Sequence, residues 1–115
     1  MPEQPGELDD EDQKLVVLAR SARARTQAAA GAAVRDQDGR SYAACDVQLA
    51  SFAVTAMQAA VTAAVSSGAT ELEAAVVVTT EESVAQGDID AARDLGTRTP
   101  IYRADSAGTV HEVLR

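Results

Sequence analysis

The spacing of apolar positions changes several times along the chain, and each spacing predicts an element. An Asp10–Gln13 pair typical of a capping box precedes apolar residues at helical intervals, which predicts a helix over residues 10–27. The apolar residues of that helical face are Leu15, Leu18, Ala19 and Ala22. Two short extended runs follow on either side of an Asp-Gly dipeptide at residues 38–39, which predicts a β-hairpin.

Residues 47–70 carry no charge, and their alanine-rich pattern predicts a central helix that begins near Ala50 or Ser51 and ends at Gly68. Polar residues recur on one face of this helix, namely Ser51, Thr55, Gln58, Thr62 and Ser66. The run is long enough for a helix that spans a membrane. Its polar interruptions and the low hydrophobicity of alanine favour a helix buried inside the domain instead.

The remaining elements alternate between strand and helix. Residues 72–80 form a β-branched run that predicts a strand buried on both faces, and a weaker helix is expected over residues 88–95, closed by Gly96. The last two strands are separated by only three residues, so they must pair antiparallel. We therefore expect an α/β protein of three layers, with a mixed five-stranded sheet covered by about three helices and a C-terminal antiparallel hairpin.

Composition and charge restrict the possible functions. The 115 residues are enough for one domain, expected over residues 11–115, and the net charge is -8. Six acids and no basic side chain lie in residues 1–12, so residues 1–10 are expected to form a flexible acidic tail. The absence of a basic face argues against binding to nucleic acid. With no secretory signal and a single cysteine, Cys45, we expect a cytoplasmic protein without a disulfide.

Two segments resemble the cytidine deaminase family. "AAAGAAVRDQDGRSYAACDVQLAS" is similar to the strand, D-G hairpin and substrate segment that open the family's domain, and "TAMQAAVTAAVSSGATELEAAVVV" to its catalytic helix and following strand. The resemblance implies the three-layer fold and a nucleoside substrate. It also implies that Asp46 and Gln48 occupy the places that bind the sugar hydroxyls, while Ala28 or Ala29 replaces the aromatic that packs on the base.

The catalytic signatures of the family are missing from this chain. The family holds Zn²⁺ with three His or Cys ligands and moves protons with a glutamate, from a C-A-E helix start and a P-C-x-x-C motif. Those first two roles fall on Thr55 and Met57, or on Met57 and Ala59 in a second register. The second motif falls around Ala85 and Asp88. With one Cys and one His in the chain, a three-ligand site cannot form within one subunit, so no metal or other cofactor is expected.

The positions of the other reactive side chains in the sequence favour structural roles over catalytic ones. Cys45 corresponds to a position beside the substrate segment, and His111 is expected at or near the surface of the last strand. Candidate nucleophiles at Ser51, Thr55 and Ser66 have no neighbouring base. The acidic pairs are Glu81 with Glu82 and Asp88 with Asp90. Helix capping explains Asp88 and Asp90 better than metal binding does.

The sequence therefore predicts a catalytically inactive member of the family that acts as a binding or assembly subunit. We expect a homo-oligomer, a dimer or a tetramer, formed through the central helix, with a further protein partner possible and no membrane or nucleic-acid partner. The first alternative is an active zinc-dependent nucleoside deaminase whose zinc site is completed by other residues or a partner chain. The second is a nucleoside sensor that uses Asp46 and Gln48 without chemistry. In the inactive protein, Met57 is expected to fill the former catalytic cavity.

Overall fold

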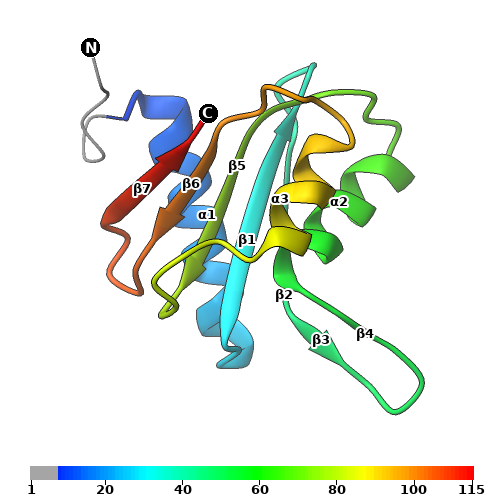
Figure 1. The fold of residues 1–115 in the computed structure, drawn as a ribbon, viewed down its shortest axis with the longest axis vertical. Coiled ribbons are helices and arrows are strands. Elements are labelled where there is room, and N and C mark those ends of the chain that lie inside the picture. Colours follow the sequence, from blue (N-terminus) through cyan, green and yellow to red (C-terminus); the bar gives the residue numbers. More distant parts are fainter. Residues whose placement is uncertain (1–7) are drawn as a thin grey trace.

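The computed structural model describes residues 8–115 and shows one mixed sheet with helices on both faces (Figure 1). The elements in chain order are α1 (Asp10–Thr26), β1 (Ala30–Asp36), β2 (Ser41–Cys45), β3 (Val47–Gln48), β4 (Ala53–Val54), α2 (Ala56–Ser66), β5 (Leu72–Thr79), α3 (Gln86–Arg93), β6 (Ile101–Ala104) and β7 (Val110–Leu114). Most of the predicted acidic tail, residues 1–7, lies outside the described residues. Asp9 caps α1 by accepting the backbone N–H of Asp12 at 2.8 Å, so this helix is capped one residue earlier than expected.

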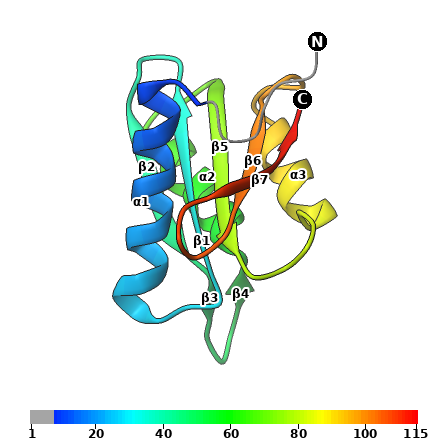
Figure 2. The ribbon, with the colours of Figure 1, turned by 90° about the vertical axis from the view of Figure 1, so that its left-hand side faces the viewer.

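The five-stranded sheet has the order β2-β1-β5-β6-β7. Only β5 and β6 are parallel, and the other neighbours in this sheet pair antiparallel. Both predicted hairpins, β1–β2 and β6–β7, are therefore confirmed, and so is the α/β fold class. Figure 2 shows α1 on one face of the sheet and α2 with α3 on the other. Because both faces are covered, the central strand β5 is buried along almost its whole length.

Successive residues of β5 contribute to two separate hydrophobic cores. Val76 and Val78 belong to the core beneath α1, together with Leu15 and Val16. Val77 belongs to the opposite core, beneath α2 and α3. This alternation follows from the two-residue period of a strand. Leu18, which the sequence places on the apolar face of this helix, is 39% exposed, because α1 turns Val16 rather than Leu18 toward the sheet.

Helix α1 approaches β1 very closely at Gly31. A Cβ atom at this position would lie 2.1 Å from the carbonyl oxygen of Ala19 and 2.8 Å from Cβ of Arg23. No side chain fits there, so the glycine permits the helix backbone to pack directly against the strand.

A buried polar network ties α1 to the sheet beneath it. The hydroxyl of Tyr102 donates to Oδ2 of Asp12 at 2.7 Å, and Oδ1 of Asp12 lies 3.0 Å from a guanidinium nitrogen of Arg35. Arg35 also pairs with Glu73 at 3.0 Å. Burial and the bond to Asp12 raise the pKa of Tyr102 well above its usual value, so this hydroxyl stays protonated and acts as a donor.

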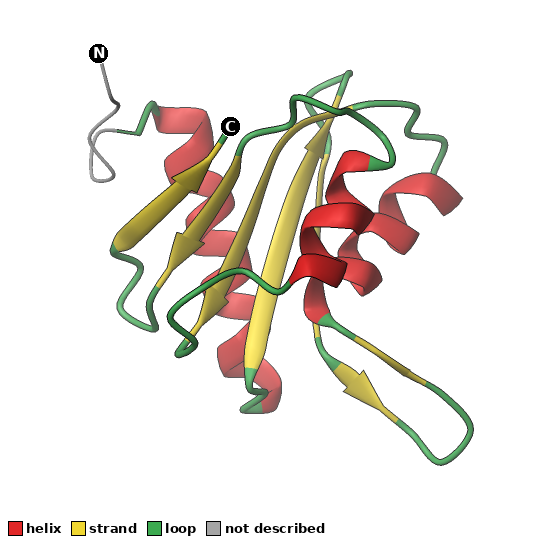
Figure 3. Cartoon of the chain, in the orientation of Figure 1, coloured by secondary structure: helices red, strands yellow, loops and turns green. Residues whose placement is uncertain are grey.

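The central helix begins five residues later than Ser51, the later of the two predicted starts. Thr55 is its N-cap and forms a capping box with Gln58, so α2 starts at Ala56. Residues 47–54 instead form the short β3–β4 hairpin, which projects beyond the sheet (Figure 3). Two polar residues on the predicted polar face of this helix form hydrogen bonds within the helix itself. The hydroxyls of Thr62 and Ser66 donate to helix carbonyls at 2.7 and 3.2 Å. These hydroxyls therefore need no partner outside the helix.

The bounds of α3 also differ from the prediction, and the helices can be tested for a membrane span. Helix α3 spans Gln86–Arg93, two residues earlier than predicted at both ends, and is followed by a turn that includes Gly96. None of the helices within residues 8–115 has the length and apolar character needed to cross a bilayer.

Candidate functional site

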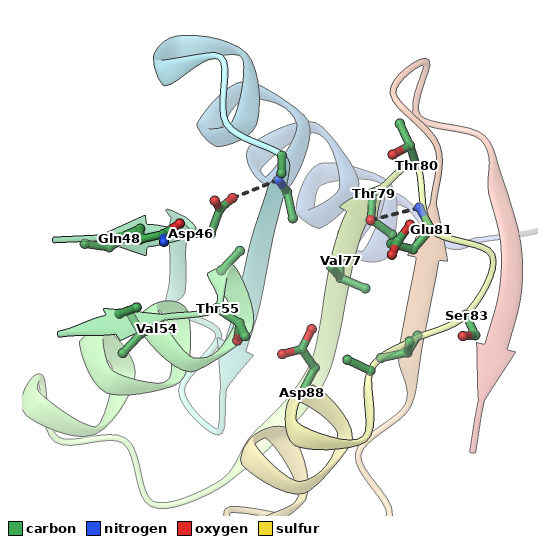
Figure 4. A pocket seen from close by; sticks show the side chains of 17 residues that line it. Asp46, Gln48, Val54, Thr55, Val77, Thr79, Thr80, Glu81, Ser83 and Asp88 are labelled. Atoms are coloured by element: carbon green, nitrogen blue, oxygen red, sulfur yellow. Dashed lines mark hydrogen bonds between the residues drawn. The ribbon is translucent and has the colours of Figure 1, made fainter. Parts of the chain in front are cut away.

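A cavity of about 620 Å³ opens at one end of the sheet, where the beginnings of two helices converge (Figure 4). Its walls come from the start of β1, the β3–β4 hairpin, the end of β5, and the first turns of α2 and α3. The cavity is lined by Ala29, Ala30, Asp46, Val47, Gln48, Ala53, Val54, Thr55, Ala56, Val77, Thr79, Thr80, Glu81, Ser83, Val84, Ala85 and Asp88. Its volume is in the range typical of small-molecule sites.

Thr55 lies in the cavity wall at the start of α2, whereas Met57 does not reach the cavity. The hydroxyl oxygen of Thr55 accepts the backbone N–H of Gln58 at 3.1 Å, and the Gln58 side chain accepts the N–H of Thr55 at 3.0 Å. Met57 is fully buried and packs in the core between α2 and the sheet. The expectation that Met57 fills the cavity is therefore wrong, because the cavity is open and Met57 is not among the residues that line it.

Asp46 and Gln48, the predicted ligand-binding residues, both line the cavity. Oδ1 of Asp46 accepts the backbone N–H of Ala30 at 2.8 Å, which connects the segment after β2 to the start of β1. Gln48 is exposed on β3. Ala29 also lines the cavity, so the wall is open where the resemblance places an aromatic side chain. The fold thus brings Asp46, Gln48 and Thr55 to one site.

Asp88 is the most deeply buried charged residue of the cavity wall, with 8% of its surface exposed. Its side chain points into the cavity from the first turn of α3 (Figure 4), and its Oδ1 has no hydrogen-bond partner among residues 8–115. The predicted capping hydrogen bond is not made, since the N-cap is Ala85 and no side chain caps this helix. Asp90, by contrast, is exposed and accepts a hydrogen bond from the Gln86 side chain at 2.9 Å.

The positions that the resemblance assigns to zinc ligands, Thr55, Ala85 and Asp88, all line this cavity. They offer a hydroxyl already engaged in a capping box, a methyl group and one carboxylate. Within residues 8–115 no group of three His, Cys, Asp or Glu side chains is arranged to hold a metal ion. The residues present do not fit a three-ligand His/Cys zinc site.

The other candidate residues lie outside the cavity wall, apart from Glu81. The Cys45 thiol is partly buried and accepts a hydrogen bond from the Thr26 hydroxyl at 3.2 Å. His111 is half exposed on β7, with Nε2 2.7 Å from Oδ2 of Asp105. The bonds from His111 and from the backbone N–H of Thr109 lower the pKa of Asp105. Ser51, Ser66 and Glu82 are exposed and do not line the cavity.

Sequence reasoning missed the hydroxyl residues at the end of β5 and in the loop after it. Thr79, Thr80 and Ser83 line the cavity beside Glu81. The available signal was their place after a buried strand, because ligand sites in α/β folds gather at the carboxyl ends of strands.

Comparisons with known proteins agree with this fold. The family model described as "Cytidine deaminase-like" matches residues 8–108. A search of curated proteins returned no match. Among solved structures, the cytidine deaminase from Burkholderia pseudomallei is 21% identical, with a TM-score of 0.75 and coverage of 88% of this chain and 89% of that chain.

Two mycobacterial structures are similar over comparable lengths. A mutant cytidine deaminase from Mycobacterium tuberculosis is 25% identical, with a TM-score of 0.68 and coverage of 83% of this chain and 85% of that chain. The cytidine deaminase from Mycobacterium leprae is 21% identical, with a TM-score of 0.69 and coverage of 90% and 93%. The family and the fold expected from the sequence are confirmed.

Proposed function

Because this chain belongs to the cytidine deaminase-like family, we propose that it keeps a ligand cavity without the hydrolytic chemistry and acts as a catalytically inactive binding or assembly subunit. The observation that carries the proposal is the start of α2, where a deaminase needs a metal ligand and a proton-shuttling glutamate. Thr55 caps the helix there, and Met57 is buried in the core. Neither side chain can shuttle a proton between water and a leaving amine.

Metal analysis and a turnover assay test this proposal directly. Purified protein is analysed by mass spectrometry for bound zinc, and the absorbance of cytidine is followed in its presence. We expect neither stoichiometric zinc nor turnover. An active zinc-dependent cytidine deaminase in the same assay shows that loss of the cytidine absorbance can be detected. Zinc in stoichiometric amount together with turnover would establish the deaminase alternative and end the proposal.

The polar wall of the cavity favours the nucleoside sensor as a second candidate. Gln48 and the second oxygen of Asp46 are free to accept hydrogen bonds from ligand hydroxyls. A ligand present at a hundred times its dissociation constant adds about 2.7 kcal/mol to the free energy of unfolding. Thermal-shift screening of nucleosides should therefore show a clear response, smaller in Gln48→Ala. A flat response across nucleosides would remove this candidate.

Assembly through α2 and the hairpin before it is the remaining part of the proposal. Leu49 and Phe52, between β3 and β4, are 57% and 56% exposed, and Val65 is exposed on α2. Large apolar side chains left exposed close together, as Leu49 and Phe52 are at the tip of this hairpin, often contact a partner. We expect a dimer or tetramer by light scattering, and a smaller species for Phe52→Ser. We also place the protein in the cytoplasm, where the Cys45 thiol stays reduced.

A further inference from the structure

The buried carboxylate of Asp88 lacks any counterpart within the cavity wall. Its Oδ1 is shielded from solvent and makes no hydrogen bond. Burying an unpaired charged group is costly, so such groups in folded proteins are normally paired with a cation or with hydrogen-bond donors. Within residues 8–115 no donor or cation pairs with Oδ1 of Asp88, so this side chain is available to a charged group of a ligand.

The charged side chains that line the cavity indicate whether the ligand group that meets Asp88 is positive or negative. The lining contains three carboxylates, those of Asp46, Glu81 and Asp88, and none of its described residues is Arg, Lys or His. Arg103 donates to the backbone carbonyl of Glu81 but forms its ion pair with Glu112, outside this wall. A cavity with acidic groups only attracts cations and repels anions such as phosphate esters.

The other residues that line the cavity indicate the chemical character of the uncharged part of the ligand. Val47, Val54, Val77 and Val84 line the cavity together with several alanines, so the cavity also offers apolar surface to a ligand. Thr55 faces Asp88 across the cavity (Figure 4), and its hydroxyl oxygen keeps a lone pair after accepting the N–H of Gln58. An ammonium group carries three donors, which the Asp88 oxygens and this hydroxyl oxygen can accept.

We propose that the cavity binds a small organic cation, whose ammonium group pairs with Asp88 while its apolar body packs against the valines. The inference rests on the proposed function, in which the cavity is a ligand site without chemistry. A bare metal ion is disfavoured because, over residues 8–115, no three ligating side chains are grouped for one. A charged hydrogen bond of this kind discriminates strongly against a neutral ligand of the same shape.

Three probes with similar aromatic bodies test the proposal at neutral pH: phenethylamine as the cation, phenethyl alcohol as the neutral analogue and phenylacetate as the anion. Binding is followed by amide chemical-shift titration of the full chain. We expect phenethylamine to shift the amides of the cavity wall and to bind about tenfold more tightly than phenethyl alcohol, as loss of one charged hydrogen bond implies. Phenylacetate should not bind.

Two variants of the same helix separate pairing from general charge. Asp88→Asn should weaken phenethylamine binding about tenfold. Asp90→Asn removes the same charge from an exposed position of α3 and should leave the affinity unchanged. Without ligand, Asp88→Asn should be at least as heat-stable as Asp90→Asn, because it removes a buried unpaired charge. This measurement also shows that the variant is folded.

Each contrary outcome overturns the proposal. Equal binding of amine and alcohol, an unchanged affinity in Asp88→Asn, or no binding of phenethylamine would each refute the pairing. A selective loss of stability in Asp88→Asn would assign Asp88 to helix capping and refute it as well. If zinc analysis and turnover remain negative in those cases, only this inference fails. Stoichiometric zinc with turnover would instead show that the proposed function itself is wrong.

Discussion

Replacing Gly31 by alanine tests the closest contact in the fold. The added Cβ would lie 2.1 Å from the carbonyl oxygen of Ala19, and 2.8 Å from both Cβ and the backbone nitrogen of Arg23. A carbon and a carbonyl oxygen normally approach to about 3.3 Å at the closest. The helix must therefore move away from the strand by about 1 Å, because rotating a side chain cannot relieve a clash with backbone atoms.

The cost follows from what that movement separates. Helix α1 contributes Leu15, Val16 and Ala19 to the core beneath it, all 2% exposed or less. A gap of about 1 Å forfeits a quarter to a half of the dispersion energy of those contacts. Overpacking of a core typically costs about 1–3 kcal/mol. Since the clash here involves the main chain, we expect about 3 kcal/mol, which lowers Tm by about 10 °C in a domain of this size.

Urea unfolding followed by far-ultraviolet circular dichroism measures this loss. Gly87→Ala is the matched control, because a Cβ there meets only Nε2 of Gln58 at 4.0 Å. In a helix this substitution should stabilise by about 0.5–1 kcal/mol. If Gly31→Ala changes the free energy of unfolding by less than about 0.5 kcal/mol, as ordinary surface substitutions do, the close packing of α1 on β1 is wrong.

Three further substitutions address the core, the polar network and the first hairpin. Tyr102→Phe removes the donor to Oδ2 of Asp12 and should cost about 1.5–3 kcal/mol in urea unfolding, and a change below about 0.5 kcal/mol would contradict that role. Met57→Ala should cost about 2–5 kcal/mol because it opens a hole in the core and not in the ligand cavity, so probe binding should survive it. Burial by itself raises the pKa of Asp36, but hydrogen bonds from Tyr42 and from two backbone N–H groups outweigh this and lower it. Ionised Asp36 therefore stabilises the fold above about pH 4, and the benefit is lost as the pH falls through the lowered pKa. Thermal unfolding should show Asp36→Asn less stable than the native protein at neutral pH and closer to it at low pH, whereas a constant difference would refute this assignment.

Much of the candidate site was predictable because its residues lie next to strong local signals. Asp46 and Gln48 follow the hairpin strand β2, and Thr55 precedes an apolar helix, so the resemblance placed all three near one cavity, as the structure shows. The start of α2 was predicted too early because residues 47–54 carry no charge and read as helix. The Thr55–Gln58 capping box, present in the sequence, marks the true boundary.

The sequence by itself determined the order of the three helices and of the five strands of the mixed sheet, with its two hairpins, but not the short β3–β4 hairpin. The spacing of apolar residues and the turn residues that gave this order are local properties. Tertiary structure alone decided which of Val16 and Leu18 enters the core, why residue 31 must be glycine, and that Oδ1 of Asp88 is buried with no hydrogen-bond partner among residues 8–115. Each of these depends on how closely a helix approaches a strand distant in sequence. That distance is set by the packing of all the layers together, and no local pattern records it.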